Sequence, residues 1–255
     1  MALSYSLLVA FATAAGYSYM RLIQGVQGAR LQTSKARQWY NQHPVVSIAL
    51  TFIYAFGSSL FFLIAVPAGI RWYLLPAVLV AGLYPIAFPN PMHSFSSLRN
   101  LPGLKLLIIS ACWVYITFII PLLMQGIALG GEQIAEGFFR LLFVAAITIP
   151  FDVRDMPFDR PELKTLPQQI GARRAIIWAC FGIGLYQFWL TVRLLFLNLE
   201  SANYLGWMLG LELGYWLVKG VNKKRSDAYV SFWVEGIPLF ILLLVIACGL
   251  LRQLF

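Results

Sequence analysis

Long apolar runs separated by short polar connections make up almost the whole chain. Eight of these runs are 15 to 24 residues long, close to the roughly 20 residues that a helix needs to cross a bilayer. They are too apolar and too long for the strands of a membrane barrel, so the pattern predicts an all-α, polytopic bundle of about eight transmembrane helices. The predicted spans are Ser4–Met20, Val45–Val66, Trp72–Ala87, Leu104–Gln125, Gln133–Ile149, Arg174–Leu197, Tyr204–Val218 and Tyr229–Leu251.

Two of these runs fit the pattern of a spanning helix less well than the other six. Trp72–Ala87 is short and contains two prolines, and Gln133–Ile149 is short and carries Glu136 and Arg140. Charged side chains are rare within membrane helices because leaving water is costly for them. The helix count therefore depends most on these two segments.

The composition leads to the same class of protein. Of the 255 residues, 60% are hydrophobic and only 11% are charged. In a soluble domain roughly a quarter of the residues are charged. This chain has less than half of that share, which is too little to cover a water-facing surface. We therefore expect residues 1–255 to form a single transmembrane domain with membrane lipids as its solvent. The net charge of +9 comes mostly from basic residues in the connections on one side of the membrane, and it does not indicate a nucleic-acid partner.

Basic residues are distributed unequally between the two sides of the predicted bundle. The odd-numbered connections hold fifteen of the nineteen Lys and Arg residues, and the even-numbered connections with the C-terminus hold four. Loops rich in Lys and Arg stay on the cytoplasmic side of a membrane. The sequence thus predicts a multi-pass integral membrane protein with its odd connections in the cytoplasm and both termini outside.

Three of the chain's four aspartates lie in one segment, FDVRDMPFDRPELKTLPQQIG (Phe151–Gly171), which follows an apolar run. If this segment is helical, Asp152, Asp155 and Asp159 project within about 60° of one another. Three carboxylates on one face repel unless a cation lies among them, and oxygen ligands of this kind suit Mg²⁺. These aspartates are therefore candidate metal ligands and candidate catalytic residues.

Basic residues accompany the aspartates and are suited to phosphate oxygens. The side chains that could hold the oxygens of a diphosphate directly are Arg154, Arg160 and Lys164. A metal ion on the aspartates could hold the same diphosphate. The alternative interpretation is a solvated loop whose charges pair with one another. Pro157 favours that alternative, because a proline breaks the helix that would align Asp159 with the other two carboxylates.

The aspartate segment resembles the second aspartate-rich motif of the UbiA superfamily of intramembrane prenyltransferases. In that motif DxxDxxxD precedes a basic residue, a Thr-Leu-Pro-like stretch and a Gly. The stretch LPGLKLLIISACWVYITFIIP, with Lys105 and Trp113, resembles the family's central helix, and the resemblance covers roughly residues 80 to 255. The matching motif positions are Asp152, Asp155, Asp159, Arg160, Lys164, Thr165, Leu166, Pro167 and Gly171.

This resemblance implies a helical bundle with a central cavity that opens laterally to lipid. It also implies transfer of a polyprenyl group from its diphosphate to a lipid or aromatic acceptor, with Mg²⁺ as cofactor. Nothing in the sequence selects the acceptor or the length of the prenyl chain. A different class of function stays open beside this one, namely a non-catalytic isoprenoid- or lipid-binding membrane protein or a transporter.

The chain departs from the family at the first aspartate-rich motif. The matching place is GYSYMRLIQGVQGAR (Gly16–Arg30), which has no Asp, Glu or Asn but carries Arg21, and the first 131 residues contain no carboxylate side chain at all. Two metals bridging a diphosphate need ligands on both sides. Three interpretations follow: Arg21 binds the diphosphate in place of a metal, or the protein binds an isoprenoid lipid without transferring it, or an active enzyme uses an altered mechanism.

Overall fold

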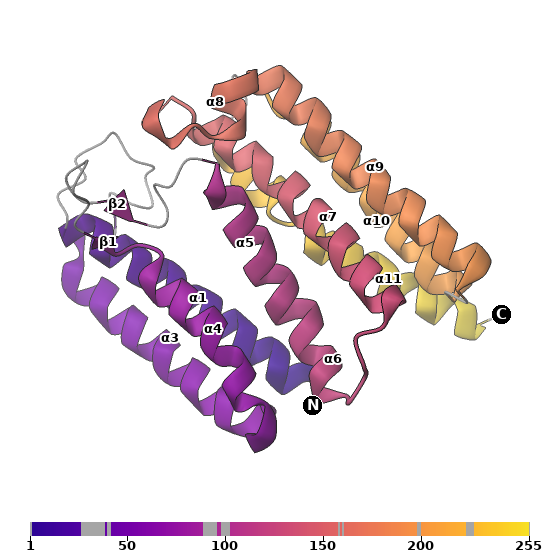
Figure 1. The fold of residues 1–255 in the computed structure, drawn as a ribbon, viewed down its shortest axis with the longest axis horizontal. Helices are drawn as coiled ribbons and strands as arrows, with labels where there is room; N and C mark the ends of the chain where they lie inside the picture. Colours follow the sequence, from indigo (N-terminus) through magenta and orange to yellow (C-terminus); the bar gives the residue numbers. More distant parts are fainter. Residues whose placement is uncertain are drawn as a thin grey trace. The chain divides into compact units, whose positions relative to one another are not determined.

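The computed structural model describes residues 2–26, 39, 42–88, 96–97, 103–157, 159, 161–197, 200–222 and 227–254, which are almost entirely helical (Figure 1). In chain order the α-helices are α1 (Ala2–Val26), α3 (Pro44–Ala65), α4 (Leu75–Leu83), α5 (Leu104–Val114), α6 (Ile120–Met124), α7 (Gly131–Asp155), α8 (Leu166–Ile170), α9 (Ala172–Phe196), α10 (Ser201–Lys219) and α11 (Ile237–Leu254). The 3₁₀ segments are η1 (Ala68–Leu74) and η4 (Pro161–Leu163), and the π-helical segments are η3 (Tyr115–Ile119) and η5 (Tyr229–Val234). Two strands of two residues each, β1 (Ala87–Phe88) and β2 (Ser96–Ser97), pair antiparallel.

Six helical stretches within the described residues are long and apolar enough to cross a membrane. They confirm the prediction of an all-helical integral membrane protein. The two remaining predicted runs are also helical: one corresponds to η1 with α4, which is shorter than the six, and the other corresponds to α10. The six stretches are Leu3–Ile23, Pro44–Ala65, Leu104–Met124, Gly131–Asp155, Ala172–Phe196 and Tyr229–Arg252.

Helix α7 is longer than the sequence predicted. The expected span ended at Ile149, whereas the helix continues through Pro150 to Asp155 and is 25 residues long. Proline removes one backbone hydrogen bond but is tolerated inside membrane helices, where neighbouring groups satisfy the carbonyl that it leaves. The first two aspartates of the motif therefore belong to a membrane-spanning helix and not to a connection.

The chain separates into two compact units. The first contains residues 1–105 and 115–128, and the second contains residues 106–114 and 129–255. The third spanning stretch, Leu104–Met124, is divided between them: most of α5 belongs to the second unit, and η3 with α6 belongs to the first. The helix changes from α to π geometry at Tyr115, the residue at which the chain passes from one unit to the other.

In the first unit, α1 and α3 pack along each other. Gly57 of α3 provides the close approach, since a Cβ at this position would come within 2.6 Å of the Phe11 ring. The ring of Phe11 also stacks on that of Phe61, with 5.6 Å between the centroids. At the end of α3, Arg71 donates to the carbonyls of Val66 and Leu63 and so satisfies backbone groups that the helix terminus leaves open.

A proline and a tyrosine together account for one carbonyl of the π-helical segment η3. In a π-helix each N–H donates to the carbonyl five residues earlier, so the carbonyl of Ile116 needs residue 121 as its donor. Residue 121 is a proline, which has no N–H. The hydroxyl of Tyr5 on α1 donates to the Ile116 carbonyl at 2.7 Å and takes over that role.

In the second unit, α7 packs on α9, α9 on α10, and α10 on α11. Its core contains residues with no exposed surface from several of these helices, among them Ile183, Leu211 and Ile237. Tyr186, also fully buried, places a hydroxyl in this apolar interior. A buried hydroxyl needs a hydrogen-bond partner, and the Tyr186 hydroxyl donates to Glu136.

Three glycines at four-residue spacing let α10 and α11 approach closely. A Cβ on Gly206 would lie 2.5 Å from the Cα of Val245, and a Cβ on Gly210 would lie 2.8 Å from the Cα of Ile241. The third glycine, Gly214, faces Ile237. The partners run in reverse order, so the two helices are antiparallel and in contact along their length, as small residues allow in membranes.

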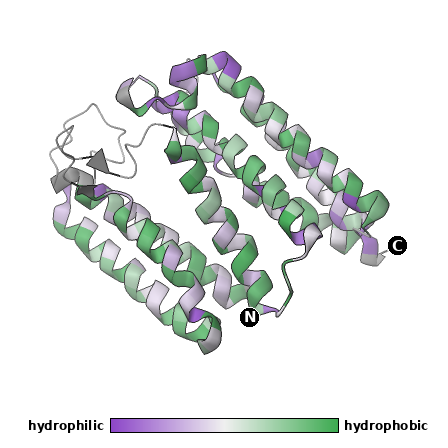
Figure 2. Cartoon of the chain, in the orientation of Figure 1, coloured by the Kyte–Doolittle hydropathy of each residue, from purple (hydrophilic) through white to green (hydrophobic). Residues whose placement is uncertain are grey.

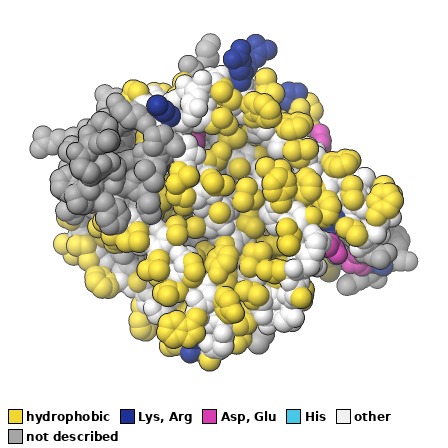
Figure 3. Space-filling model, in the orientation of Figure 1, with side chains coloured by type: hydrophobic (Ala, Val, Ile, Leu, Met, Phe, Trp, Pro, Cys, Tyr) yellow, Lys and Arg dark blue, Asp and Glu magenta, His cyan; other side chains and the backbone are white. Residues whose placement is uncertain are grey.

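Apolar side chains dominate the surface of the described residues, in agreement with a lipid environment. Figure 2 shows that hydrophobic residues prevail along the helices and that hydrophilic residues concentrate near helix ends. Figure 3 shows hydrophobic side chains over most of the described surface in that view. Large side chains such as Trp72, Phe196 and Phe52 are more than 70% exposed, which water would penalise and lipid does not.

Candidate functional site

The aspartate motif lies at the C-terminal end of α7 in the second unit. Asp152 is 1% exposed, and Asp155, the last residue of the helix, is half-buried. Asp159 lies beyond the helix, although its N–H still donates to the Asp155 carbonyl at 2.9 Å. The three aspartates are therefore not on one helix face, and the helix ends where Pro157 indicated.

Arg154 holds Asp155 in a two-point ion pair. Its Nε donates to Asp155 Oδ1 at 2.7 Å and its Nη2 to Oδ2 at 3.0 Å. The remaining Nη1 donates to Ser231 Oγ at 2.9 Å, so η5, which precedes α11, fixes the guanidinium. The guanidinium carbon also lies 5.3 Å from the centroid of the Phe151 ring. Of the basic residues expected to bind diphosphate, Arg154 is thus engaged by protein groups.

The chain after the aspartates folds back as a short, internally bonded turn. The side chain of Gln168 accepts from the Thr165 N–H at 2.9 Å, and the side chain of Gln169 donates to the Lys164 carbonyl. Lys164 has φ of 44°, the left-handed region that residues with a Cβ rarely adopt, and its side chain is exposed. The Thr-Leu-Pro stretch therefore forms the start of α8, and Gly171 ends that helix with φ of 85°.

For two other predicted residues, a role at this site stays a prediction. Arg160 lies outside the described residues. Arg21 is a half-buried residue of α1 in the first unit, whereas the aspartates lie in the second. The hypothesis that Arg21 and the aspartates share one diphosphate consequently stays a prediction.

The aspartates do not fit a ready-made Mg²⁺ site in this arrangement. Magnesium needs oxygen ligands with free lone pairs close together. Both oxygens of Asp155 instead accept from Arg154, and no group of three His, Cys, Asp or Glu side chains within the described part of the chain is close enough to hold a metal ion. A metal at Asp155 would have to compete with the guanidinium already there.

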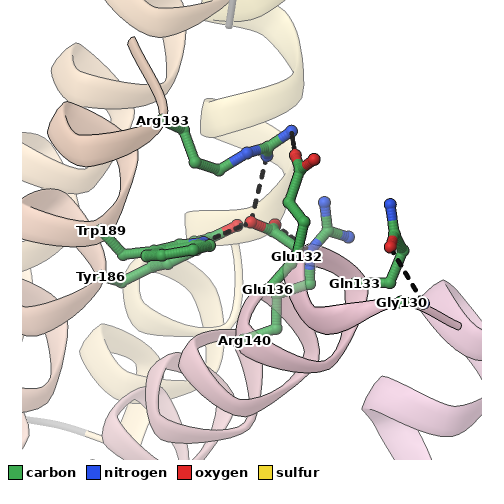
Figure 4. Close-up of polar contacts among 8 residues, drawn as sticks. All are labelled: Gly130, Glu132, Gln133, Glu136, Arg140, Tyr186, Trp189 and Arg193. Atoms are coloured by element: carbon green, nitrogen blue, oxygen red, sulfur yellow. Dashed lines mark hydrogen bonds and ion pairs between the residues drawn. The ribbon is translucent and has the colours of Figure 1, made fainter. Parts of the chain in front are cut away.

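A second polar site, which the sequence did not reveal, lies at the opposite end of α7 (Figure 4). Its centre is Glu136, which is only 3% exposed. Glu136 Oε1 accepts from Arg140 Nε at 2.6 Å and from the Tyr186 hydroxyl at 2.9 Å. Its Oε2 accepts from Trp189 Nε1 at 2.8 Å and from Arg193 Nη1 at 3.0 Å. The pairing of Arg140 with Glu136 was within reach of sequence reasoning, because the two residues are one helical turn apart.

The Glu136 cluster is charge-balanced, and the Glu136 carboxylate at its centre is fully hydrogen-bonded, although the buried Nε of Arg193 has no partner among the described residues. Arg193 also contacts Glu132, with 3.3 Å between Nη2 and Oε1, so two guanidinium groups face two carboxylates. Each oxygen of Glu136 accepts two hydrogen bonds, which leaves the carboxylate saturated. A buried ion pair of this kind is stable only when its hydrogen bonds are made. The arrangement can therefore fasten α7 to α9, and it offers the carboxylate no open position for a ligand.

Glu212 is an exposed carboxylate on α10. It accepts from Trp216 Nε1 at 2.8 Å and from Gln187 Nε2 at 3.3 Å. These neutral donors lie on α10 itself and on α9, so Glu212 adds a polar contact between the two helices. Glu235 is exposed at the end of η5.

A scan against protein-family models found no match for this chain, and comparisons with the curated proteins and with the solved structures found none either.

Proposed function

We propose that this protein is a UbiA-like membrane prenyltransferase, or a degenerate relative of one, that takes a polyprenyl group from its diphosphate. The acceptor, lipid or aromatic, is unidentified. The observation that carries the proposal is the buried carboxylate of Asp152 in the last turns of a spanning helix, followed by a segment rich in basic residues. Intramembrane carboxylates are costly and mark functional sites.

The proposed topology has eight spans, with the aspartate end of α7 and the loop after it on the cytoplasmic side and both termini outside. Two short helical stretches, α10 and η1 with α4, are long enough to support the count of eight spans. Helix α10 has 19 residues, which at 1.5 Å each extend about 28 Å. The seven residues of η1 rise about 2.0 Å each, so η1 and the nine residues of α4 together extend about 27 Å. Both lengths approach the roughly 30 Å of a bilayer's hydrocarbon core.

The proposal is tested with the purified protein in detergent and geranylgeranyl diphosphate as the probe. We expect saturable binding of the probe, and release of diphosphate once a suitable acceptor is supplied. Lipids that co-purify with the protein, identified by mass spectrometry, would point to that acceptor. A protein that binds neither the probe nor any isoprenoid lipid would contradict both the transferase and the lipid-binding alternative.

Asp152→Asn and Asp155→Asn are each expected to abolish transfer while the helical circular-dichroism spectrum stays the same. The amide keeps the shape of the carboxyl group but removes its negative charge, and at Asp155 it also removes the partner that holds the Arg154 guanidinium. Glu132→Gln is the matched control, because it removes a carboxylate from the same helix about 30 Å away. Unchanged turnover in both aspartate variants would exclude the site.

One observation favours the alternative function, a non-catalytic isoprenoid-binding membrane protein or a transporter. The expected partner motif is missing from the first 131 residues, and Asp155 is engaged by Arg154. A protein with this function would bind geranylgeranyl diphosphate or a quinone-like lipid and would return it unchanged. Measured binding without turnover for every acceptor tested would therefore select this alternative.

A further inference from the structure

We propose that the Arg154 guanidinium takes the place of a divalent cation at Asp155, so that a prenyl diphosphate binds this end of α7 without a metal bridge through that carboxylate. The inference deepens the proposed function and rests on it for the identity of the ligand. Its geometric part, the replacement of a metal by Arg154, can be tested without any ligand.

The pairing of Arg154 with Asp155 is not a by-product of helix geometry. Neighbouring residues on a helix project about 100° apart, and side chains at i and i+1 do not normally face each other. Here the guanidinium nevertheless turns back onto the next residue and engages both carboxylate oxygens, at 2.7 and 3.0 Å. Asp155 is the last residue of α7, and Met156 after it still has helical backbone angles, so the pairing depends on the two side chains and not on a break in the backbone.

The guanidinium is held in this position by groups from elsewhere in the second unit. Ser231, 77 residues further along the chain, accepts from Nη1 at 2.9 Å, and the Phe151 ring lies 5.3 Å from the guanidinium carbon. Arginine presents its donors in a rigid planar fork, so a bond to Nη1 also orients the edge that faces Asp155. Ser231 is therefore a positioning residue, which acts on Asp155 through Arg154.

The charges around Arg154 explain why a cation is needed there. Asp227 and Glu235 are near enough to interact electrostatically with the guanidinium, in addition to Asp155. Asp155 is half-buried, whereas Asp227 and Glu235 are exposed, and carboxylates near one another repel unless a positive charge lies among them. At Asp155, the cation that the sequence suggested would be a metal is thus a side chain of the protein.

Exposed basic side chains at the same end of the unit could bind the diphosphate itself. Lys164 precedes α8, and Arg173 and Arg174 begin α9, which runs antiparallel to α7. All three are exposed, and Lys and Arg bind phosphate oxygens directly. The site would accordingly take the anionic head of a prenyl diphosphate through these side chains and not through a metal at Asp155.

The metal part is tested by electron paramagnetic resonance with Mn²⁺, which prefers the same oxygen ligands as Mg²⁺. We expect the wild type and the Asp155→Asn variant to bind equal numbers of Mn²⁺ ions. The Arg154→Gln variant should bind one ion more than the double variant that carries both Arg154→Gln and Asp155→Asn. If the wild type binds one ion more than Asp155→Asn, the proposal is wrong. Failure of Arg154→Gln to bind an additional ion would overturn it as well.

Ser231 supplies a second variant that leaves both charged residues in place. Ser231→Ala loses one hydrogen bond and is expected to admit Mn²⁺ at a higher concentration than Arg154→Gln requires, whereas Ser231→Thr keeps the hydroxyl and should behave as the wild type. A purely structural role for Ser231 would change the unfolding temperature and leave Mn²⁺ binding unaltered. That result would overturn the positioning role.

The ligand part is tested by binding geranylgeranyl diphosphate to the wild type in EDTA and in excess Mg²⁺. We expect Mg²⁺ to tighten binding by less than about threefold, and a larger gain would overturn the inference. In Arg154→Gln, Mg²⁺ should tighten binding by more than that factor, because Asp155 is then open to the ion. If no probe binds in either condition, the proposed function fails, while the Mn²⁺ experiment still decides the role of Arg154.

Discussion

At the scale of single residues, the chain neutralises its carboxylates with arginines of its own. The sequence identified Asp152 and Asp155 as unusual, because so few aspartates occur and they cluster after an apolar run. It did not identify the partners of Glu136, since Tyr186, Trp189 and Arg193 lie some fifty residues away on another helix. Local spacing predicts contacts within a helix, whereas contacts between helices depend on packing that one sequence does not display.

Glu136→Leu is expected to destabilise the protein strongly. It would leave Arg140 and Arg193 without the carboxylate that pairs them, and removing one partner of a buried ion pair costs about 3–5 kcal/mol. Unfolding of the purified protein by SDS, followed by circular dichroism, measures the loss. Glu132→Gln, which affects a more exposed carboxylate of the same cluster, should cost less than about 1 kcal/mol. Equal losses in the two variants would contradict the central place of Glu136.

Arg21→Ala tests whether the first unit takes part in ligand binding. If Arg21 replaces the missing metal ligands, the variant should bind geranylgeranyl diphosphate about tenfold more weakly, the loss expected from one charge-assisted phosphate contact. Arg71→Ala is the control, because Arg71 is an arginine of the same unit that caps α3. Unaltered affinity in Arg21→Ala would end the replacement hypothesis.

At the scale of elements, helix positions followed from the apolar pattern and helix ends did not. All eight predicted runs are helical, but α7 continues six residues beyond its predicted end at Ile149, through a proline. The π-helical segments were not predicted, because they depend on tertiary contacts such as that of Tyr5 with the Ile116 carbonyl. The close approach of α10 to α11 was visible in principle, as Gly206, Gly210 and Gly214 recur every four residues.

Gly210→Ala is expected to weaken the contact between α10 and α11. The new Cβ would lie 2.8 Å from the Cα of Ile241, a backbone atom that cannot move aside without displacing the helix. Overpacking of this kind costs about 1–3 kcal/mol, measurable by unfolding in SDS. Gly184→Ala on α9 is the matched control, since its Cβ would meet no atom within 4 Å. A larger loss in the control than in Gly210→Ala would contradict the packing described here.

At the scale of the whole molecule, composition was sufficient to establish a membrane protein, and charge distribution predicts its orientation. The sequence predicted one transmembrane domain, and the structure adds that the chain separates into two compact units. The sequence did not predict the division into two units, because the apolar pattern is equally strong in both of them. The division also crosses a continuous apolar run, Leu104–Met124, which no pattern of hydrophobicity marks as a boundary.

The orientation is tested by labelling single cysteines with a maleimide that does not cross membranes. In a background with Cys112, Cys180 and Cys248 replaced by serine, Ala128→Cys and Lys164→Cys flank α7 on its two sides. We expect labelling of position 128 from outside intact cells and of position 164 only after the membrane is opened, because basic loops remain in the cytoplasm. The reverse result would invert the topology.

The pairing of Glu136 with Arg140 also has a consequence for biogenesis. Membrane helices are synthesised one after another, so α7 meets the insertion machinery before α9 exists to supply Arg193. Since Arg140 lies one turn from Glu136 on the same helix, with 2.6 Å between Nε and Oε1, the nascent segment already contains a counter-ion for its glutamate. The ribosome thus delivers a helix in which Glu136 and Arg140 can neutralise each other before any neighbour arrives, which lowers the barrier to leaving the translocon.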